Sequence, residues 1–301
     1  MRFRTNLAKS AGNRAFREIK LSIADFGSHA RRRGPLAPPA EFGIMRRVTP
    51  ESEIAMNAPN APRLSVIIPA YNEEQRLGPT LDKLTEYFAR VDYAVEVLVV
   101  NDGSADRTAE IANARAGGPL HLRVLAYGGN RGKGYAVRHG MLQAAGQYRL
   151  FYDADGSTPI DQVEKFWPHF AAGAAVCLGS RALPGADVVV AQPWHRRLMG
   201  RVFNGMVRAL TVSGFQDTQC GFKAFAAPAA DLIFRRQQLT GFGFDVELLF
   251  IAQCHGLKAV ETPVQWIDSP SSRISPLRDS TRMFLEVLKI RWLALKGAYN
   301  A

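Results

Sequence analysis

The chain has 301 residues, of which 47% are hydrophobic and 22% charged, enough for one large α/β domain or two small domains. This composition excludes a chain that is disordered throughout. No stretch reaches the roughly 18–20 consecutive apolar residues that a membrane-crossing helix needs, so the sequence predicts no transmembrane span. Three scattered cysteines exclude a disulfide framework and a cysteine-based zinc site, and they favour a reducing compartment.

The positive charge of the chain is unevenly placed. Lysine and arginine outnumber aspartate and glutamate by 38 to 27, a formal net charge of +11, and more than half of this excess lies in residues 1–62. Aromatic residues are not interleaved with basic ones, as they are in a nucleic-acid-binding groove. We therefore expect no nucleic-acid partner.

Residues 1–62 form a basic leader that we expect to be disordered. Arg31, Arg32 and Arg33 lead into the sequence GPLAPP, a turn-forming and extended composition that cannot pack a core. Two explanations stay open. In the first, translation starts downstream at Met45 or Met56, and most of the leader is not part of the protein. In the second, the leader is a basic arm attracted to a membrane surface.

From Leu64 onwards, short apolar runs alternate with helical patterns. The runs stay apolar along their whole length, which is typical of a parallel sheet covered by helices on both faces. Residues 63–275 are therefore predicted to form an α/β domain with a mostly parallel central sheet, and ligands should bind beyond the carboxyl ends of its strands. The predicted strands are 64–68, 95–100, 122–126 and 148–152, and the predicted helices lie at 77–88, 108–116 and 135–145.

Three polar clusters directly follow predicted strands: 69–74, 101–104 and 153–156. In the third cluster, Asp153 and Asp155 share a short loop, and carboxylates so close repel each other unless a cation or water screens them. Oxygen ligands without histidine or cysteine suit Mg²⁺ or Mn²⁺, completed by substrate phosphates and water. A solvated turn is the alternative interpretation.

The glycine-rich stretch 128–134 precedes a predicted helix, whose N-terminus attracts anions. Its spacing is not that of a P-loop, because Tyr127 and Gly134 occupy positions that need other residues, and the dinucleotide-binding spacing is absent as well. A P-loop ATPase and a Rossmann dehydrogenase are thus excluded. Lys133 is a candidate contact to a diphosphate, and a glycine-rich turn with a helix cap is the alternative.

Taken in order, these motifs resemble those of the family 2 glycosyltransferases of GT-A fold, in the branch of dolichyl-phosphate β-glucosyltransferases and polyprenyl-phosphate glycosyltransferases. The resemblance covers about residues 64–292, and the ordered series is more specific than any single motif. It consists of VIIPAYNEE (66–74), NDGSAD (101–106), NRGKG (130–134), DADG (153–156), GSR (179–181), DTQCGFK (217–223) and FDVELL (244–249).

The resemblance implies that the sugar donor, a nucleotide-sugar, binds at the first three of these motifs and at the D-x-D loop. The residues implied to line the nucleoside pocket are Pro69, Tyr71, Glu73 and Asp102. Asp155 is implied to bind the metal that bridges the diphosphate, and Asp153 to contact this metal or the ribose side of the donor. Lys133 completes the predicted nucleotide-sugar-binding set.

The acceptor decides which side chains the reaction needs. A sugar hydroxyl needs a carboxylate base, whereas a lipid phosphate has a second pKa near ~6, is mostly dianionic at neutral pH and needs cations that hold it. By resemblance to polyprenyl-phosphate glycosyltransferases, Arg181 and Arg196 hold this phosphate. Arg273 lies in a serine-rich loop, 271–275, that resembles a family loop closing over the phosphates.

Two further carboxylates, Asp217 and Asp245, join Asp155 as candidates for catalysis. The resemblance implies that they orient the acceptor or the donor sugar. A structural role, such as accepting a hydrogen bond from Lys223 or capping a helix, stays open for each. Residues 276–301 alternate basic and apolar positions around Trp292, which predicts an amphipathic helix that lies in the headgroup region of a membrane or packs on the main domain.

The resemblance implies an inverting transfer of glucose from UDP-glucose to a polyprenyl phosphate. The protein would work in the cytoplasm, peripherally associated with the inner face of the membrane. One alternative is transfer to a hydroxyl of a saccharide or protein. Another is a nucleotide-sugar-binding module without catalysis, anchored to a membrane by its basic ends.

Overall fold

The computed structural model describes residues 61–188, 205, 207, 210–267 and 276–300. The predicted leader, except for its last two residues, lies outside the described residues, as do Arg196, Arg273 and the loop 271–275. The elements in chain order are β1 (Leu64–Ala70), α3 (Leu77–Phe88), β2 (Val95–Asn101), α4 (Thr108–Asn113), β3 (Leu122–Ala126), α5 (Lys133–Gln143), β4 (Tyr148–Tyr152), η1 (Ile160–Phe166), α6 (Trp167–Ala171), β5 (Val176–Ser180), β6 (Asp187–Val188), β7 (Phe222–Ala226), α8 (Ala227–Arg236), α9 (Phe244–Cys254), β8 (Ala259–Pro263), β9 (Gln265–Trp266) and α10 (Pro276–Leu295).

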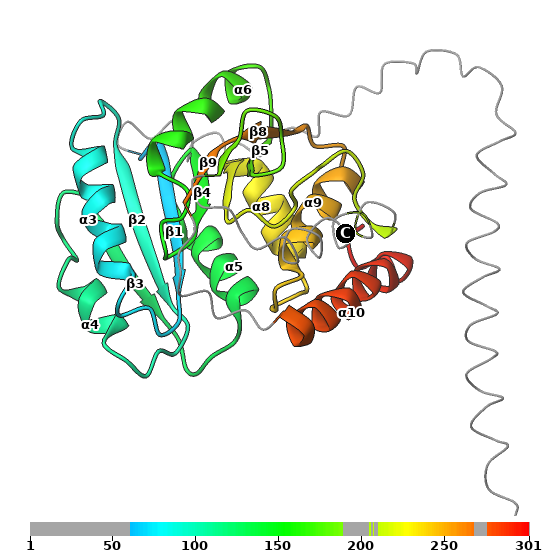
Figure 1. Ribbon diagram of the computed structural model, residues 1–301, viewed down its shortest axis with the longest axis horizontal. Coiled ribbons are helices and arrows are strands. Elements are labelled where there is room, and N and C mark those ends of the chain that lie inside the picture. The colour runs from blue at the N-terminus through cyan, green and yellow to red at the C-terminus, as the bar shows by residue number, and fades with distance from the viewer. Residues whose placement is uncertain (1–60, 189–204, 206, 208–209, 268–275, 301) are drawn as a thin grey trace, which may run out of the picture. The chain divides into compact units, whose positions relative to one another are not determined.

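A seven-stranded sheet with the order β3-β2-β1-β4-β7-β5-β8 forms the centre of the domain (Figure 1). The pairs β3–β2, β2–β1, β1–β4 and β5–β8 are parallel, and β7 runs antiparallel between β4 and β5. The two short strands β6 and β9 pair separately. The predicted α/β class with a mostly parallel central sheet is therefore confirmed.

The four predicted strands agree closely with β1 to β4. The first strand is longer than predicted, because its pairing with β2 continues past Pro69 to Ala70. Proline lacks an N–H group, but β4 pairs with β1 only as far as Ile67, so one side of the strand is already unpaired there. The sheet edge with the polar clusters thus begins after Ala70, Asn101 and Tyr152.

The strands β1 to β4 of the large sheet send alternate side chains into two separate hydrophobic cores, which explains why these strands are mostly apolar along their length. In β1, Ile67 belongs to one core, and Val66 and Ile68 belong to the other. The first core is covered by α5, α8, α9 and α10 and the second by α3, α4, η1 and α6. Buried side chains on both faces of the sheet therefore hold the strands in place, and the strands position the polar loops at their carboxyl ends.

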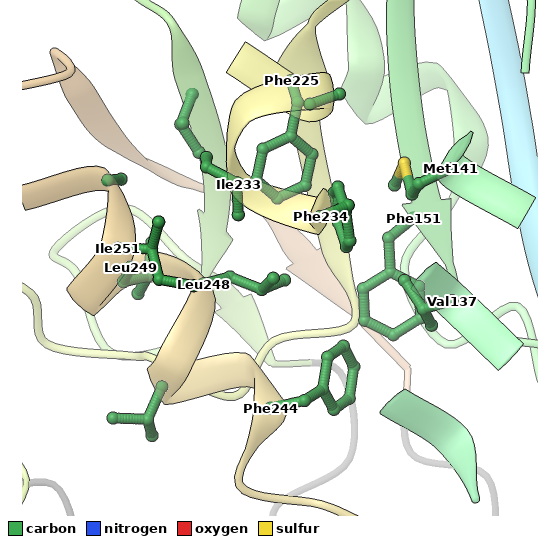
Figure 2. Packing of buried hydrophobic residues seen from close by; sticks show 14 of the residues in the cluster. Val137, Met141, Phe151, Phe225, Ile233, Phe234, Phe244, Leu248, Leu249 and Ile251 are labelled. Carbon is green, nitrogen blue, oxygen red and sulfur yellow. The ribbon is translucent and has the colours of Figure 1, made fainter. Parts of the chain in front are cut away.

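Figure 2 shows part of the first core, in which side chains of α5, β4, β7, α8 and α9 pack together. In this core, Phe151 of β4 meets Phe244 of α9 edge to face, with ring centroids 5.6 Å apart. Phe151 comes two residues before Asp153, and Phe244 directly precedes Asp245. Packing of two aromatic rings therefore sets the distance between two polar segments that are far apart in sequence.

Helix α10 packs beside α9 at one end of the domain (Figure 1). Val287 and Ile290 of α10 are completely buried in the first core, so the predicted packing of this segment on the main domain is present. None of the helices in the described ranges combines the length and apolar character needed to cross a bilayer.

Replacing Gly140 of α5 with alanine should destabilise the protein. An added Cβ would lie 2.5 Å from Ile67 Cγ2 and 2.8 Å from Val100 Cγ2, so we expect the free energy of unfolding to fall by about 1–3 kcal/mol. Urea unfolding measures this change, and Gly128→Ala, where a Cβ meets nothing within 4 Å, is the control. A gain of about 1 kcal/mol, as helix propensity alone would give, would contradict the tight packing.

Candidate active site

The loops that follow β1 and β2 are joined by hydrogen bonds at the carboxyl edge of the sheet. The Asn72 amide donates to Ser104 Oγ at 3.0 Å, and the Ala105 amide donates to Asn72 Oδ1 at 2.9 Å. The Glu73 amide donates to Thr108 Oγ1 at 2.7 Å. Because the two strands are parallel neighbours, their loops emerge side by side. The first two polar clusters therefore form one wall of a site.

Three residues predicted to line a nucleoside pocket lie on this wall. Tyr71 has 46% of its surface exposed, whereas Pro69 is buried within β1. Glu73 forms an ion pair with Arg76, whose guanidinium lies 2.5 Å from the Glu73 carboxylate. Tyr71 thus offers an accessible ring, and Glu73 is held in place by a cation three residues further along the chain.

Asp102 is only 3% exposed, and protein donors occupy both of its carboxylate oxygens. Its Oδ1 accepts from the Tyr127 hydroxyl at 3.0 Å and the Arg131 amide at 2.7 Å, and its Oδ2 accepts from the Gly132 amide at 3.0 Å. Burial and the Asp102 charge raise the pKa of Tyr127 well above its ordinary value, so the hydroxyl keeps its proton. Asp102 therefore fastens the loop 128–134 to the end of β2, and its place in the nucleoside pocket stays a prediction.

The two carboxylates of the D-x-D loop each have a cationic neighbour. Lys133 Nζ lies 2.7 Å from Asp153 Oδ1, and Arg76 Nη1 lies 3.9 Å from Asp155 Oδ2. Burial alone would lower the pKa of Lys133, but the carboxylates of Asp153 and Asp245 raise it above its ordinary value. Lys133 thus brings the glycine-rich loop to the D-x-D loop. The positive charges of Lys133 and Arg76 offset the repulsion between the two carboxylates.

Backbone contacts on two sides fix the D-x-D loop. The Thr80 hydroxyl donates to the Ala154 carbonyl at 2.9 Å, and the Asp153 amide donates to the Gly221 carbonyl at 3.2 Å. A Cβ added at Gly221 would lie 1.8 Å from Asp153 Oδ2. Only glycine at this position leaves room for the Asp153 carboxylate, which explains the glycine in the motif 217–223.

The D-x-D loop fits a divalent cation that a substrate helps to coordinate. The Asp153 and Asp155 side chains are 32% and 25% exposed, so their oxygens are accessible from solvent. Across the described part of the chain, no three histidine, cysteine, aspartate or glutamate side chains converge as a complete metal site. Mg²⁺ is commonly held by one or two carboxylates together with substrate phosphates and water, and the donor set here matches that pattern.

Another ion pair near the Phe151 ring is buried, with Lys223 Nζ 5.9 Å from the ring centroid. Lys223, completely buried in the central strand β7, donates to the Asp245 carboxylate and to the Cys220 carbonyl, the latter at 2.7 Å. Burial raises the pKa of Asp245 above its ordinary value, against the attraction of Lys223 and Lys133. The structural alternative for Asp245, acceptance from Lys223, is therefore present.

Arg181, at the end of β5, forms a two-point ion pair with Asp217. Its Nε and Nη2 lie 2.7 and 2.9 Å from the two carboxylate oxygens, and its amide adds a third contact at 3.0 Å. Despite burial, the Arg181 charge lowers the pKa of Asp217 to about 2. Glu261 of β8 accepts from the Asp217 amide at 2.7 Å and so fixes the loop. Two of the five guanidinium donors are engaged, and the Arg181 side chain is 31% exposed.

The ion pairs of Asp153, Asp217 and Asp245 belong to one site. The Asp153 charge contributes to the raised pKa of Arg181, and the Lys223 charge to the lowered pKa of Asp217. Arg76, Tyr127 and Glu261 are site residues that sequence reasoning missed. Only Arg76 left a readable signal there, because its spacing of three residues from Glu73 permits an ion pair at the start of a helix.

Comparison with known proteins identifies the family. Residues 65–228 match the model of Glycosyl transferase family 2. The chain is 35% identical to dolichyl-phosphate β-glucosyltransferase of Homo sapiens over 254 residues, which cover 79% of this chain and 78% of that protein. It is 32% identical to dolichyl-phosphate β-glucosyltransferase of Saccharomyces cerevisiae, with coverage of 79% and 76%.

Solved structures agree on the fold. Glucosyl-3-phosphoglycerate synthase from Mycobacterium tuberculosis, in complex with Mn²⁺, UDP-glucose and phosphoglyceric acid, superposes with a TM-score of 0.57 at 20% identity, covering 76% of this chain and 79% of that one. The complex of the same enzyme with Mg²⁺ and UDP also gives 0.57. The predicted GT-A fold and the resemblance read from the motifs are thus confirmed, and the chain belongs to glycosyl transferase family 2.

Proposed function

We propose that this protein transfers glucose from UDP-glucose to a polyprenyl phosphate, with inversion at the anomeric carbon. Relatives at 32–35% identity that carry the name dolichyl-phosphate β-glucosyltransferase support this donor sugar and acceptor class. The observation within this chain that carries the proposal is the Arg181–Asp217 pair beside the D-x-D loop. A fixed guanidinium fork matches the oxygens of a phosphate acceptor.

The donor would lie across the carboxyl edge of the sheet. Tyr71 offers a ring for the nucleoside base, and Asp102 shapes the pocket through the loop 128–134. Asp153 and Asp155 are the residues that would hold a divalent cation, Mg²⁺ or Mn²⁺, and the metal and UDP complexes of glucosyl-3-phosphoglycerate synthase support this assignment. When bound, such a cation neutralises negative charge on the departing diphosphate.

The reaction is a single displacement. An oxygen of the acceptor phosphate attacks the anomeric carbon of glucose from the face opposite the diphosphate, and a new carbon–oxygen bond forms. The bond from that carbon to the diphosphate oxygen breaks, and its electron pair leaves with UDP. Because the attacking phosphate is already an anion near neutral pH, no side chain has to remove a proton. Arg181 orients the phosphate.

The burial and pairing of Asp217 and Asp245 favour a phosphate acceptor over a hydroxyl acceptor. A hydroxyl acceptor needs an accessible carboxylate as general base. Asp245 is 4% exposed and bound to Lys223, and Asp217 is 3% exposed and bound to Arg181. Both carboxylates thus hold cations in place, which supports positioning roles for them.

The acceptor also sets where the reaction takes place. A polyprenyl phosphate is a membrane lipid, so the site has to reach a bilayer surface. We place the protein at the cytoplasmic face of the membrane, where nucleotide sugars are available, as a peripherally associated enzyme.

Asp155→Asn should lower the rate of glucose transfer by about 100-fold or more, because the cation loses a charged ligand. The rate is measured with radiolabelled UDP-glucose and a polyprenyl phosphate, and Mn²⁺ binding in the presence of UDP is measured by electron paramagnetic resonance. Asp92→Asn, at an exposed position, is the control. An unchanged rate with unchanged Mn²⁺ affinity would rule out the metal role of Asp155.

Arg181→Ala and Asp217→Asn should each lower kcat/KM for the polyprenyl phosphate by about 10- to 100-fold and leave KM for UDP-glucose nearly unchanged. The double variant should be no worse than the more damaged single variant, because the two residues act together. Steady-state kinetics with each substrate varied tests this, with Arg107→Ala in the exposed Arg107–Glu110 pair as the control. A loss confined to the donor KM would contradict the assignment.

Lys223→Met should lower the free energy of unfolding by about 3–5 kcal/mol, because it leaves the buried Asp245 carboxylate without its partner. The double variant Lys223→Met/Asp245→Leu should regain most of this stability. Chemical denaturation measures both, with the exposed Lys83→Met as the control. If the single variant were as stable as the parent protein, the pair would have no positioning role.

A further inference from the structure

Helix α10 presents two faces of opposite character. Its inner face packs on the domain: Val287 and Ile290 are fully buried, and the Gly243 amide donates to Glu286 Oε2 at 2.6 Å. Its outer face exposes large apolar side chains. These are Leu285, Leu288, Trp292 and Leu295, with 58%, 42%, 52% and 79% of their surfaces exposed.

These four side chains form a continuous stripe. Their spacings of three, four and three residues place them in neighbouring positions on one side of a helix, over a length of about 15 Å. The other large apolar side chains that are exposed in the described ranges, Tyr71, Val188, Phe242 and Ile267, are not aligned in this way on any helix. Scattered apolar residues are ordinary on protein surfaces, but an aligned stripe indicates a binding surface.

Basic residues flank the stripe on both sides. Lys289 is a helical neighbour of Leu285 and Trp292, and Arg291 is a helical neighbour of Leu288 and Leu295. Lys296 lies with its ammonium group 3.9 Å from the centroid of the Trp292 ring. Between residues 280 and 301 the sequence contains one acidic residue, Glu286, and its carboxylate is bound to the inner face. The outer face is therefore apolar along its centre and positive along its edges.

We propose that this face of α10 docks on an anionic bilayer surface. Apolar side chains with a tryptophan enter the headgroup boundary, and lysine and arginine at the flanks bind lipid phosphates. A second copy of the chain fits less well, because it would bring two rows of like charges together. The inference rests on the proposed function, since it names the surface through which the enzyme meets its lipid acceptor.

The same helix contacts the site. Gln219 Nε2 lies 3.7 Å from Met283 Sδ, and Gln219 belongs to the loop in which Asp217 holds Arg181. Glu286 is bound to Gly243, directly before the helix that begins with Phe244 and Asp245. A bilayer bound to the outer face of α10 would thus be mechanically connected to the residues that hold the acceptor phosphate.

Sedimentation of the full chain with lipid vesicles tests the docking. The parent protein should bind vesicles of phosphatidylcholine containing about 30% phosphatidylglycerol more tightly than vesicles of phosphatidylcholine alone. Leu285→Ser/Leu288→Ser should weaken binding to the anionic vesicles by about 10-fold or more, and Leu285→Met/Leu288→Met, which keeps the apolar surface, should not. Lys289→Gln/Lys296→Gln should weaken binding to the anionic vesicles, whereas Arg90→Gln, at an exposed position after the end of α3, should leave it unchanged.

Activity separates the failure of this inference from the failure of the proposed function. With a short, water-soluble prenyl phosphate, the Leu285→Ser/Leu288→Ser variant should transfer glucose as fast as the parent, and with a long-chain acceptor in anionic vesicles it should lose about 10-fold in rate. Equal vesicle binding by the parent and this variant would overturn the docking surface, even if transfer to the short acceptor is normal. Absence of transfer to either acceptor would overturn the proposed function, even if vesicle binding follows the stripe.

The test also distinguishes a second copy of the chain as the occupant. Analytical ultracentrifugation without lipid should give the same mass for the parent and for Leu285→Ser/Leu288→Ser. If the parent were dimeric and the variant monomeric, with vesicle binding unchanged, the stripe would be a dimer interface and the bilayer proposal would fail.

Discussion

Pairing of opposite charges at the carboxyl edge of the sheet is the constraint on which the site depends. Four aspartates gather there around the end of β4 and the beginning of β7, and so many carboxylates in a partly buried region repel one another. Each has a cation beside it. Asp153 pairs closely with Lys133, Asp217 with Arg181 and Asp245 with Lys223, and Arg76 lies 3.9 Å from Asp155.

This balance explains how the site can receive charged substrates. A nucleoside diphosphate sugar carries negative charge on its diphosphate, and a divalent cation that enters with it carries a compensating positive charge. The electrostatic balance of the unliganded site is thus little changed by a donor that arrives with its cation. In the proposed reaction, the acceptor phosphate would bind the remaining N–H groups of Arg181, whose orientation Asp217 sets.

The strands and helices of residues 64–156 could be predicted from sequence because the patterns that specify them lie within short segments of the chain. Apolar runs such as 95–100 and polar clusters such as 101–104 mark both the strands and their carboxyl ends, so the predicted sheet edge agrees with the structure. The partners of the site residues could not be predicted in the same way. Lys133 meets Asp153, and Arg181 meets Asp217, only because loops distant in sequence converge above the sheet.

Two assignments illustrate the limit of reasoning from motifs. The resemblance implies that Asp102 lines the nucleoside pocket, but it does not reveal that the oxygens of Asp102 accept from Tyr127 and from the amides of residues 131 and 132. For residues 276–301 the sequence leaves domain packing and membrane contact as alternatives, but a helix has two faces. Val287 and Ile290 pack inward while Leu288 and Trp292 face solvent. A motif names a residue type but not the direction in which its side chain points.

The hydrogen bonds of Asp102 have a consequence for the energetics of donor recognition. Three donors on one buried carboxylate fix the backbone ahead of α5 while the protein folds, so the conformational entropy of this segment is lost before any nucleotide arrives. In the proposed reaction, association with UDP-glucose would resemble the docking of a flexible ligand onto a preorganised, rigid wall, in which the conformational freedom given up belongs mainly to the ligand.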